Sequence, residues 1–157
     1  MLWRVFHQMH HAPRRLDATG AFVFHPTEML IYTGLGLGVN ALVLGIDPVA
    51  ASIVGFLGVF NAVFQHANVR TSRVLAWLIQ RPEAHSIHHA RDIHGWNYSD
   101  FPLWDMVFGT YRSAQGFQPR VGFGDDQSGR WAQMARFADV HAADFRRAPL
   151  PKLHTEG

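Results

Sequence analysis

Two neighbouring stretches of the chain contain no residue with a fixed charge, and their length is that of membrane-spanning helices. Residues 29–46 supply 18 such positions, and residues 48–69 form the second stretch, which begins at the proline of an Asp-Pro pair. An 18-residue helix is about 27 Å long, close to the hydrocarbon thickness of a bilayer. A pair of buried core helices in a soluble protein is the alternative. Because neither stretch has a polar face, we favour a membrane hairpin over residues 29–69.

The charges around this predicted hairpin indicate its orientation. Its turn carries Asp47 and no cation, whereas arginines flank the hairpin on both sides (Arg4, Arg14 and Arg15 before it; Arg70, Arg73 and Arg81 after it). Positive residues concentrate on the cytoplasmic side of membrane proteins. We therefore expect a multi-pass membrane protein with both ends of the hairpin in the cytoplasm.

Small residues recur inside both apolar stretches. Gly34 and Gly38 form a G-x-x-x-G pair in the first stretch. The second stretch has small residues at helical spacing (Ala51, Gly55, Gly58 and Ala62). Such stripes allow membrane helices to approach each other closely.

Histidine is over-represented, with 11 of 157 residues, and cysteine is absent. The lack of cysteine excludes disulfides, thiolate metal sites and cysteine nucleophiles within this sequence. The 14 Lys and Arg and 12 Asp and Glu leave a formal charge of +2. With so small a charge and no basic run, nucleic acid is not an expected partner. Imidazole is the commonest metal-binding side chain, so the histidines point to metal.

Six of the histidines occur in two copies of one pattern, H-x-x-H-H, at residues 7–11 and 85–89. On a helix these offsets place three imidazoles on one face, and three neutral imidazoles can hold one divalent metal ion. Chance or a histidine-rich surface could explain one copy, but two identical copies favour two metals. Redox-active iron accepts imidazole ligands and activates O₂, whereas zinc would need only one such site.

The predicted hairpin brings both patterns to the same membrane face. His66 lies near the end of the second apolar stretch, at the same boundary, where a polar residue is costly without a partner. We therefore include His66 among the candidate ligands. Asp92, three residues after His89, is either an orienting partner for an imidazole or a solvated helix charge.

The last third of the chain is more polar. Residues 113–129 are rich in Gly, Gln and Asp and predict a loop. Residues 130–145 predict one amphipathic helix, because apolar side chains recur at helical spacing (Trp131, Met134, Ala138, Ala142 and Phe145). Residues 146–157, with two prolines, predict a loose tail.

Several short segments together resemble the fatty acid hydroxylase/sterol desaturase superfamily of integral membrane di-iron oxygenases. They are Leu-Trp-Arg-Val-Phe-His (2–7) leading into His10-His11, His-Pro-Thr-Glu (25–28), Phe-Gln-His-Ala-Asn-Val-Arg (64–70), Pro-Glu-Ala-His (82–85) leading into His88-His89, Asn97-Tyr98, and Leu-Trp-Asp-Met-Val-Phe-Gly-Thr-Tyr (103–111). Their order and spacing match over residues 2–112, whereas residues 113–157 add little. One mild departure is Ser99, where the family often has glycine.

The resemblance implies an all-α membrane domain over residues 1–112, in which a helical hairpin carries a cytoplasmic, histidine-rich helical cap with two non-haem iron ions. It implies support of the site by hydrogen bonds from Asn97 and Tyr98, and an anchoring role for Asp105. His25 fits a structural or helix-capping role at least as well as a ligand role, and His94 lies in a variable stretch. The implied iron ligands are His7, His10, His11, His66, His85, His88 and His89.

The family also has an earlier H-x-x-x-H motif and further membrane helices, upstream of the Leu-Trp-Arg segment. The resemblance therefore implies two more ligands before Met1, and the chain is expected to be the later part of a larger membrane enzyme. A misplaced start codon or a degenerate relative is the alternative origin.

The function implied by the resemblance is O₂-dependent hydroxylation or desaturation of a C–H bond in a membrane lipid, such as a sterol or fatty acyl chain. A separate protein would donate the electrons, because the sequence has no flavin or nicotinamide motif. The first alternative is a truncated, catalytically inactive membrane remnant that binds metal. The second is a membrane zinc hydrolase, which the absence of H-E-x-x-H disfavours.

Overall fold

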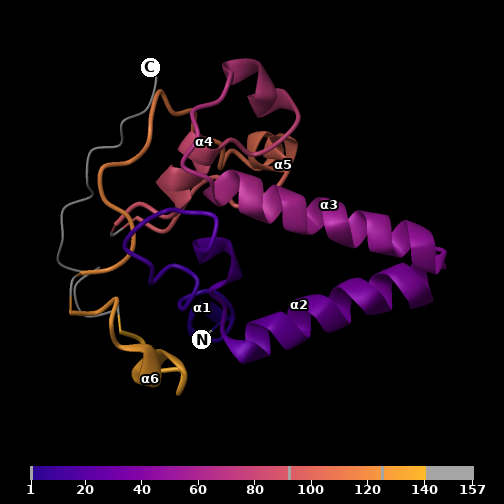
Figure 1. Cartoon of the computed structure of the whole chain (residues 1–157), viewed down its shortest axis with the longest axis horizontal. Coiled ribbons are helices and arrows are strands. Elements are labelled where there is room, and N and C mark those ends of the chain that lie inside the picture. The colour runs from indigo at the N-terminus through magenta and orange to yellow at the C-terminus, as the bar shows by residue number, and fades with distance from the viewer. Residues whose placement is uncertain (1, 92, 125, 141–157) are drawn as a thin grey trace.

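The computed structural model describes residues 2–91, 93–124 and 126–140, and this part of the chain is helical without a β-strand (Figure 1). An isolated antiparallel bridge joins Ala90 to Val121. The elements are α1 (Leu2–Phe6), the 3₁₀ helix η1 (Gly20–Phe22), α2 (Pro26–Gly38), the π-helical η2 (Val39–Val43), α3 (Pro48–His66), the 3₁₀ helix η3 (Arg73–Trp77), α4 (Pro82–His88), α5 (Pro102–Val107) and α6 (Trp131–Met134).

Helices α2 and α3 form two long arms that meet at a turn far from the other elements (Figure 1). The first apolar stretch, expected to be helical over 29–46, is helical from Pro26 to Val43 because α2 continues directly into η2. Gly45 closes the turn with a φ of 58°. Asp47 then caps α3, since its Oδ1 accepts hydrogen bonds from the backbone nitrogens of Val49 and Ala50 at 2.8 and 3.4 Å.

The polarity of α3 is inverted relative to a helix of a water-soluble protein. Its buried residues are all polar (Asn61, Gln65 and His66), whereas large apolar side chains such as Phe56 remain exposed. It is the one described helix that is long and apolar enough to cross a membrane, and only 11% of its apolar window is buried. A core helix of a soluble protein would be mostly buried, whereas α3 is mostly exposed.

The glycine stripes do not bring the two arms together. A Cβ atom placed on Gly34, Gly38, Gly55 or Gly58 would meet no atom within 4 Å. The expected close approach is therefore wrong for contacts within the described chain. The arms instead diverge from their shared turn, and the small residues of α3 leave space between them (Figure 1).

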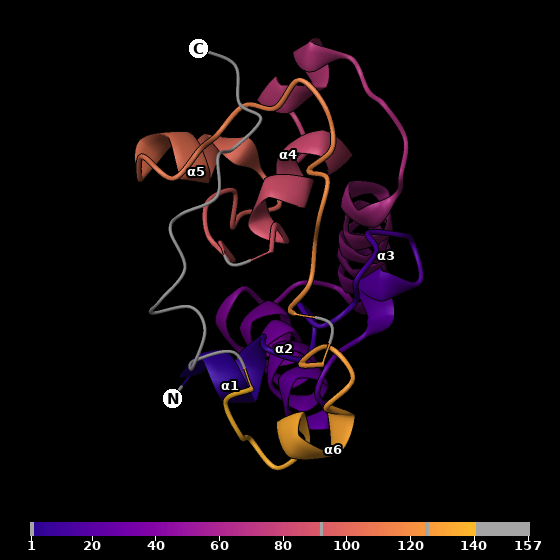
Figure 2. The same cartoon turned by 90° about the vertical axis from the view of Figure 1, so that its left-hand side faces the viewer.

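The compact end of the molecule is held mainly by buried polar groups. Figure 2 looks along the arms and places α4 between α3 and α5. All seven residues of α4 are buried. Glu83 anchors this helix, because its carboxylate accepts hydrogen bonds from the backbone nitrogen and hydroxyl of Thr71 at 2.6 and 2.8 Å. Separately, a small apolar cluster of Ala12, Phe123, Met134 and Val140 packs against Trp3 and Met9.

The predicted amphipathic helix over 130–145 is much shorter within the described residues. Helix α6 ends at Met134, and Phe137 has a φ of 59°. The buried side chain of Gln8 explains this ending, because it hydrogen-bonds the carbonyl of Ala138 at 2.8 Å and the amide of Val140 at 3.0 Å. Those backbone groups are thereby withdrawn from a helix. Ala142, Phe145 and the predicted tail lie outside the described residues.

Candidate metal centre

The first H-x-x-H-H pattern follows directly on α1 in a helical turn. The amide of His7 donates to the carbonyl of Trp3 at 3.0 Å, and the amide of His11 donates to the carbonyl of His7 at 3.3 Å. This turn keeps the helical offsets that the spacing predicts. His10 and His11 are buried, and His7 is partly exposed.

The second pattern lies at the end of α4. Pro82 begins this helix, and its fixed φ suits the first helical position. His89 caps the helix, and its amide donates to the carbonyl of His85 at 3.2 Å. Because α4 is enclosed by its neighbours, the imidazoles of His85, His88 and His89 are at most 5% exposed.

The seven predicted ligands form two groups, and each group draws on both patterns. Three histidines form one group (His7, His11 and His88), and four form the other (His10, His66, His85 and His89). Within each group, the ligand atoms all lie within 4.8 Å of one another. The structure thus brings together all seven histidines, in the two sets expected for two metals.

The two histidine groups do not coincide with the two sequence patterns. Positions i and i+4 are about 40° apart around a helix, whereas i+3 and i+4 are about 100° apart. His7 and His11 therefore share one group, while His10 turns to the other. The second pattern does the same, because His85 and His89 stay together while His88 crosses to the first group. Each i, i+4 pair receives the middle histidine of the opposite pattern.

The spacing of the imidazole nitrogens is that of ligands around a small metal ion. Neighbouring Nε2 atoms in the three-histidine group are 3.0 Å apart for His11 and His88 and 3.3 Å apart for His7 and His88. In the four-histidine group the corresponding separations are 3.0, 3.4 and 3.0 Å. Nitrogens bound at about 2.1 Å to one ion lie about 3.0–3.4 Å apart in octahedral or tetrahedral geometry.

The hydrogen bonds of the opposite ring nitrogens indicate that several of these Nε2 atoms carry lone pairs. Carbonyl oxygens only accept, so Nδ1 must donate in His10 (to Val23, 3.2 Å), His66 (to Ala62, 2.7 Å) and His88 (to Trp96, 2.9 Å). In a neutral imidazole Nε2 is then an acceptor. The Nε2 atoms of His10 and His66 face each other at 3.0 Å, where two lone pairs repel unless a cation lies between them. The donor set therefore fits a metal.

Burial keeps these imidazoles neutral at physiological pH. It lowers the pKa of His88 to about 3, with a further lowering from His7 and a partial opposing effect of the hydrogen bond to Trp96. Burial, followed by the repulsion of neighbouring imidazoles, also holds the pKa of several others well below the usual 6.5 (His10, His11, His85 and His89). Metal coordination requires the neutral form.

Sequence reasoning assigned no role to Glu28, which lies against the three-histidine group. Its Oε1 is 3.0 Å from Nδ1 of His7, and the side chain is fully buried. A carboxylate on the non-ligating nitrogen orients a metal-bound imidazole and strengthens it as a ligand. The available signal was a lone carboxylate at the start of an otherwise uncharged helix, within the His-Pro-Thr-Glu segment.

His94 also adjoins the site, although its stretch of sequence gave no basis for a role. Its Nδ1 lies 2.9 Å from Nδ1 of His11, and its ring packs near Trp3 and Phe123. The backbone of His94 has a φ of 42°, a conformation that sequence spacing does not reveal.

The predicted supporting residues act mainly through the backbone. Asn97 donates from Nδ2 to the carbonyls of Ala84 and Arg112 at 2.8 and 2.9 Å, so it ties the following loop to α4. Tyr98 places its ring edge-on to His88, with centroids 5.3 Å apart. Asp92 lies outside the described residues.

Two further expectations are confirmed. His25 caps α2, because its Nδ1 accepts a hydrogen bond from the amide of Thr27 at 3.1 Å. Asp105 anchors the loop before α5, since its buried carboxylate accepts from the amides of Tyr98 and Ser99 at 3.0 and 2.9 Å. Neither residue belongs to the two histidine groups.

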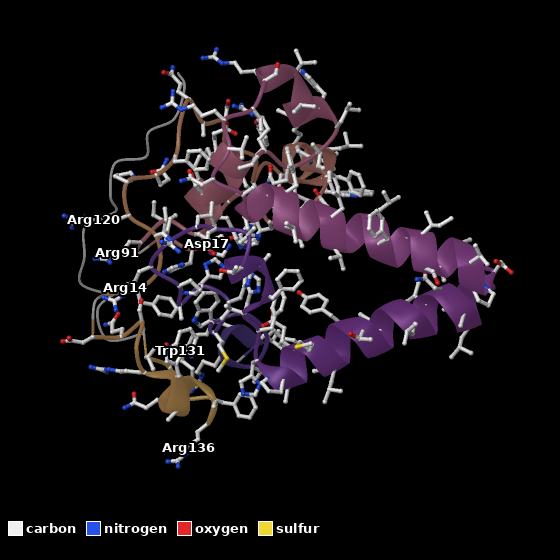
Figure 3. All side chains as sticks on the ribbon, in the orientation of Figure 1. Arg14, Asp17, Arg91, Arg120, Trp131 and Arg136 are labelled. Atoms are coloured by element: carbon white, nitrogen blue, oxygen red, sulfur yellow. The ribbon has the colours of Figure 1, made fainter. Side chains whose placement is uncertain are left out.

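A cavity of about 610 Å³ opens between α2 and α3 and ends at the histidines. Its walls include apolar and small residues of both arms, such as Met29, Gly55, Gly58, Val59 and Ala62. Five of the seven candidate ligands also line it: His7, His10, His66, His85 and His88. The arms run away from the compact end, where Figure 3 places Arg14, Arg91, Arg120 and Arg136 on the side opposite the turn. An apolar cavity that leads to a metal centre suits a long hydrocarbon ligand.

Comparison with known proteins finds one matching family model and several similar proteins. Residues 1–110 match the family model described as fatty acid hydroxylase. A very-long-chain aldehyde decarbonylase from Oryza sativa subsp. indica is 29% identical over 130 residues, covering 76% of this chain and 50% of that protein. A sphingolipid C4-hydroxylase from Schizosaccharomyces pombe is 30% identical over 122 residues, covering 75% of this chain and 42% of that protein.

A third relative is sphinganine C4-monooxygenase 1 from Arabidopsis thaliana, which is 28% identical over 138 residues, covering 80% of this chain and 53% of that protein. The chain thus spans about half the length of the curated relatives that it matches. No solved structure was found to match the chain.

Proposed function

The chain belongs to the fatty acid hydroxylase family, and we propose that it binds two iron ions and uses O₂ to oxidise a C–H bond of a membrane lipid. The reaction is a hydroxylation or a desaturation. The observation that carries the proposal is the pair of interleaved histidine groups at the end of an apolar cavity. The relatives named as a sphingolipid C4-hydroxylase and a sphinganine C4-monooxygenase support an oxidoreductase that acts on lipids.

The two histidine groups divide the work of holding the metals. His7, His11 and His88 hold one ion, and His10, His66, His85 and His89 hold the other. Bound iron supplies the activation of O₂ and the removal of electrons from the lipid. The protein fixes the imidazoles through their second nitrogens, as Glu28 does for His7 and the carbonyl of Trp96 does for His88.

The cavity positions the lipid. Apolar residues of α2 and α3 would bury its hydrocarbon chain, and the histidines in the cavity lining would hold the metals near the C–H bond. The same walls exclude water, which protects a reactive centre from side reactions.

The membrane supplies this lipid directly to the cavity. We propose that both arms lie in the bilayer as a multi-pass hairpin, because α3 is long and apolar enough to span and its exposed surface is apolar. The arginines at the compact end support a cytoplasmic location for the metal centre, because positive residues concentrate on that side of membrane proteins. A separate cytoplasmic protein donates the electrons.

Iron content and oxygen-dependent lipid oxidation test this proposal together. The full chain, purified in detergent and reconstituted with ferrous iron without oxygen, is expected to retain about two iron ions per chain. With an electron donor, O₂ and a long-chain lipid mixture, mass spectrometry should find products that gain one oxygen atom or lose two hydrogens.

A matched pair of histidine variants tests whether iron binding requires the candidate ligands or is affected by the loss of any histidine. His10→Asn should reduce bound iron, because His10 lies in the four-histidine group. His25→Asn should retain wild-type iron content, since asparagine preserves the cap of α2. Tightly bound zinc with O₂-independent hydrolysis would overturn the proposal in favour of a hydrolase, and iron bound without lipid oxidation would reduce it to a metal-binding module.

A further inference from the structure

The cavity wall contains an acidic side chain that the proposed metal chemistry does not use. Asp100 lies in the cavity lining beside Gln65, whose Nε2 donates to Oδ1 of Asp100 at 2.9 Å. Gln65 is buried and directly precedes the candidate ligand His66. The carboxylate therefore stands close to the metal centre, in a cavity whose other walls are largely apolar.

The backbone around Asp100 is fixed by three further hydrogen bonds. Its carbonyl accepts from the amide of Gln80 at 3.0 Å and from the side chain of Asn61 at 3.4 Å. The next amide, that of Phe101, donates to the hydroxyl of Ser99 at 3.2 Å. The position of the carboxylate is thus set before a ligand binds, which lowers the entropy cost of binding.

The charge of Asp100 is not matched by the protein. In the described part of the chain, no cationic side chain lies within ion-pair distance of this carboxylate, and its hydrogen-bond partner Gln65 is neutral. Burial raises the pKa of Asp100, with a smaller opposing effect of the bond from Gln65. Asp100 remains solvent-exposed as a residue although it lines the cavity, and its carboxylate can pair with a ligand group that donates hydrogen bonds or carries positive charge.

We propose that Asp100 binds the polar end of the lipid substrate through an ammonium or hydroxyl group, and that it excludes lipids that end in a carboxylate. This inference rests on the proposed lipid oxidation and names the class of lipid. The ammonium or hydroxyl hydrogen-bonds Asp100 at the wall formed by Gln65, while the hydrocarbon chain follows the apolar surfaces of α2 and α3. A lipid carboxylate would face the like charge of Asp100, which discriminates against it.

Lipid binding tests this proposal without any oxidation step. A saturated amine, alcohol and carboxylic acid of one chain length each compete with a fluorescent long-chain lipid for the full chain in phosphatidylcholine nanodiscs. Wild-type protein should bind the amine about tenfold or more tightly than the acid, with the alcohol between them, because hydrogen bonds to charged groups are worth at least about a tenfold change.

Two variants at Asp100 distinguish the effect of its negative charge on lipid binding from the effect of its hydrogen bond with Gln65. Asp100→Asn keeps an oxygen that can accept from Gln65 but removes the charge, and it should reduce the amine-to-acid preference to about twofold or less. Asp100→Glu keeps the charge and should retain the preference. Asp126→Asn removes an exposed carboxylate outside the cavity and is the control for overall charge.

The proposal is overturned if wild-type protein binds the acid as tightly as the amine, or if Asp100→Asn retains the full preference. Should Asp100→Asn fail to fold by circular dichroism, the wild-type ranking together with Asp100→Glu still decides. Loss of lipid oxidation with intact selectivity would count against the proposed oxygenase function instead, so the two failures are distinguishable.

Discussion

The two histidine groups differ in how completely the protein surrounds them. All four histidines of the larger group are buried, and their four ligand nitrogens lie within 4.8 Å of one another. The smaller group has three histidines. One of them, His7, is partly exposed and forms a hydrogen bond with Glu28. A closed set of ligands tends to hold a metal firmly, whereas an open coordination position leaves room for reactants. We infer that the larger group contributes more to metal retention and the smaller group more to reactivity.

Removing one candidate ligand from each group should have the largest effect and tests most directly whether the two groups differ in metal retention. His88→Ala leaves two histidines in the smaller group, whereas His85→Ala leaves three in the larger group. We expect His88→Ala to lower bound iron from about two ions to about one and to reduce lipid oxidation at least about 100-fold. His85→Ala should weaken metal retention but keep part of the second ion, because three imidazoles still hold a divalent metal.

Metal analysis after dialysis against a chelator, with mass spectrometry of lipid products, measures both effects. His25→Asn is the control, since His25 caps α2 and belongs to neither group. Equal metal loss in His85→Ala and His88→Ala would contradict the difference between the groups.

Glu28 provides the next test, with an intermediate effect on the smaller group alone. Glu28→Gln should reduce lipid oxidation about 10–100-fold, as expected for loss of a partner that orients a ligating histidine. The neutral amide no longer polarises the imidazole of His7 through its Nδ1. Iron bound by the larger group should remain, so we expect at most a partial fall in total iron. Unchanged turnover of Glu28→Gln would show that His7 does not depend on this carboxylate.

The smallest effect concerns the pH dependence of the metal-free protein. The pKa of His88 falls to about 3 on folding, and those of His10, His11, His85 and His89 also fall. The unfolded chain therefore binds more protons than the folded chain below the ordinary histidine pKa of about 6.5. Stability should be fully present above that pH and should decrease as the pH falls from 6.5 towards 3.

Thermal unfolding of the metal-free chain in detergent between pH 8 and pH 5 checks this expectation. The Tm should be nearly constant down to about pH 7 and should then fall, because the buried imidazoles resist protonation. Bound metal should delay the fall to lower pH, since protons must then compete with the ion. A Tm that rises on acidification would contradict the lowered pKa values.

Sequence spacing was sufficient to identify six of the candidate ligands because it reports local geometry. The H-x-x-H-H offsets placed three imidazoles within one turn, and the structure brings all six of these residues together with His66. Family membership, suggested by the same segments, is confirmed over residues 1–110. The apolar stretches likewise indicated α2 and α3, because helix length and polarity depend mainly on the residues within each segment.

Other features depended on contacts between distant segments. The helix expected over 130–145 ends at Met134 because Gln8, far away in sequence, binds the backbone at Ala138 and Val140. The glycine stripes suggested close helix packing, yet Gly55 and Gly58 line a cavity. Periodicity within one segment contains no information about the segment that packs against it.

The sequence by itself determined which side chains are candidate metal ligands and which helices present apolar surfaces. Only the tertiary structure decided which imidazoles lie together in one group, because α4 packs against the turn after α1, so that His88 joins His7 and His11 while His10 joins His85 and His89. It also brought Glu28 to His7 and set Asp100 into the wall of the cavity. Spacing along the chain fixes the angle between neighbouring side chains, whereas coordination and substrate binding depend on distances between segments that only folding brings together.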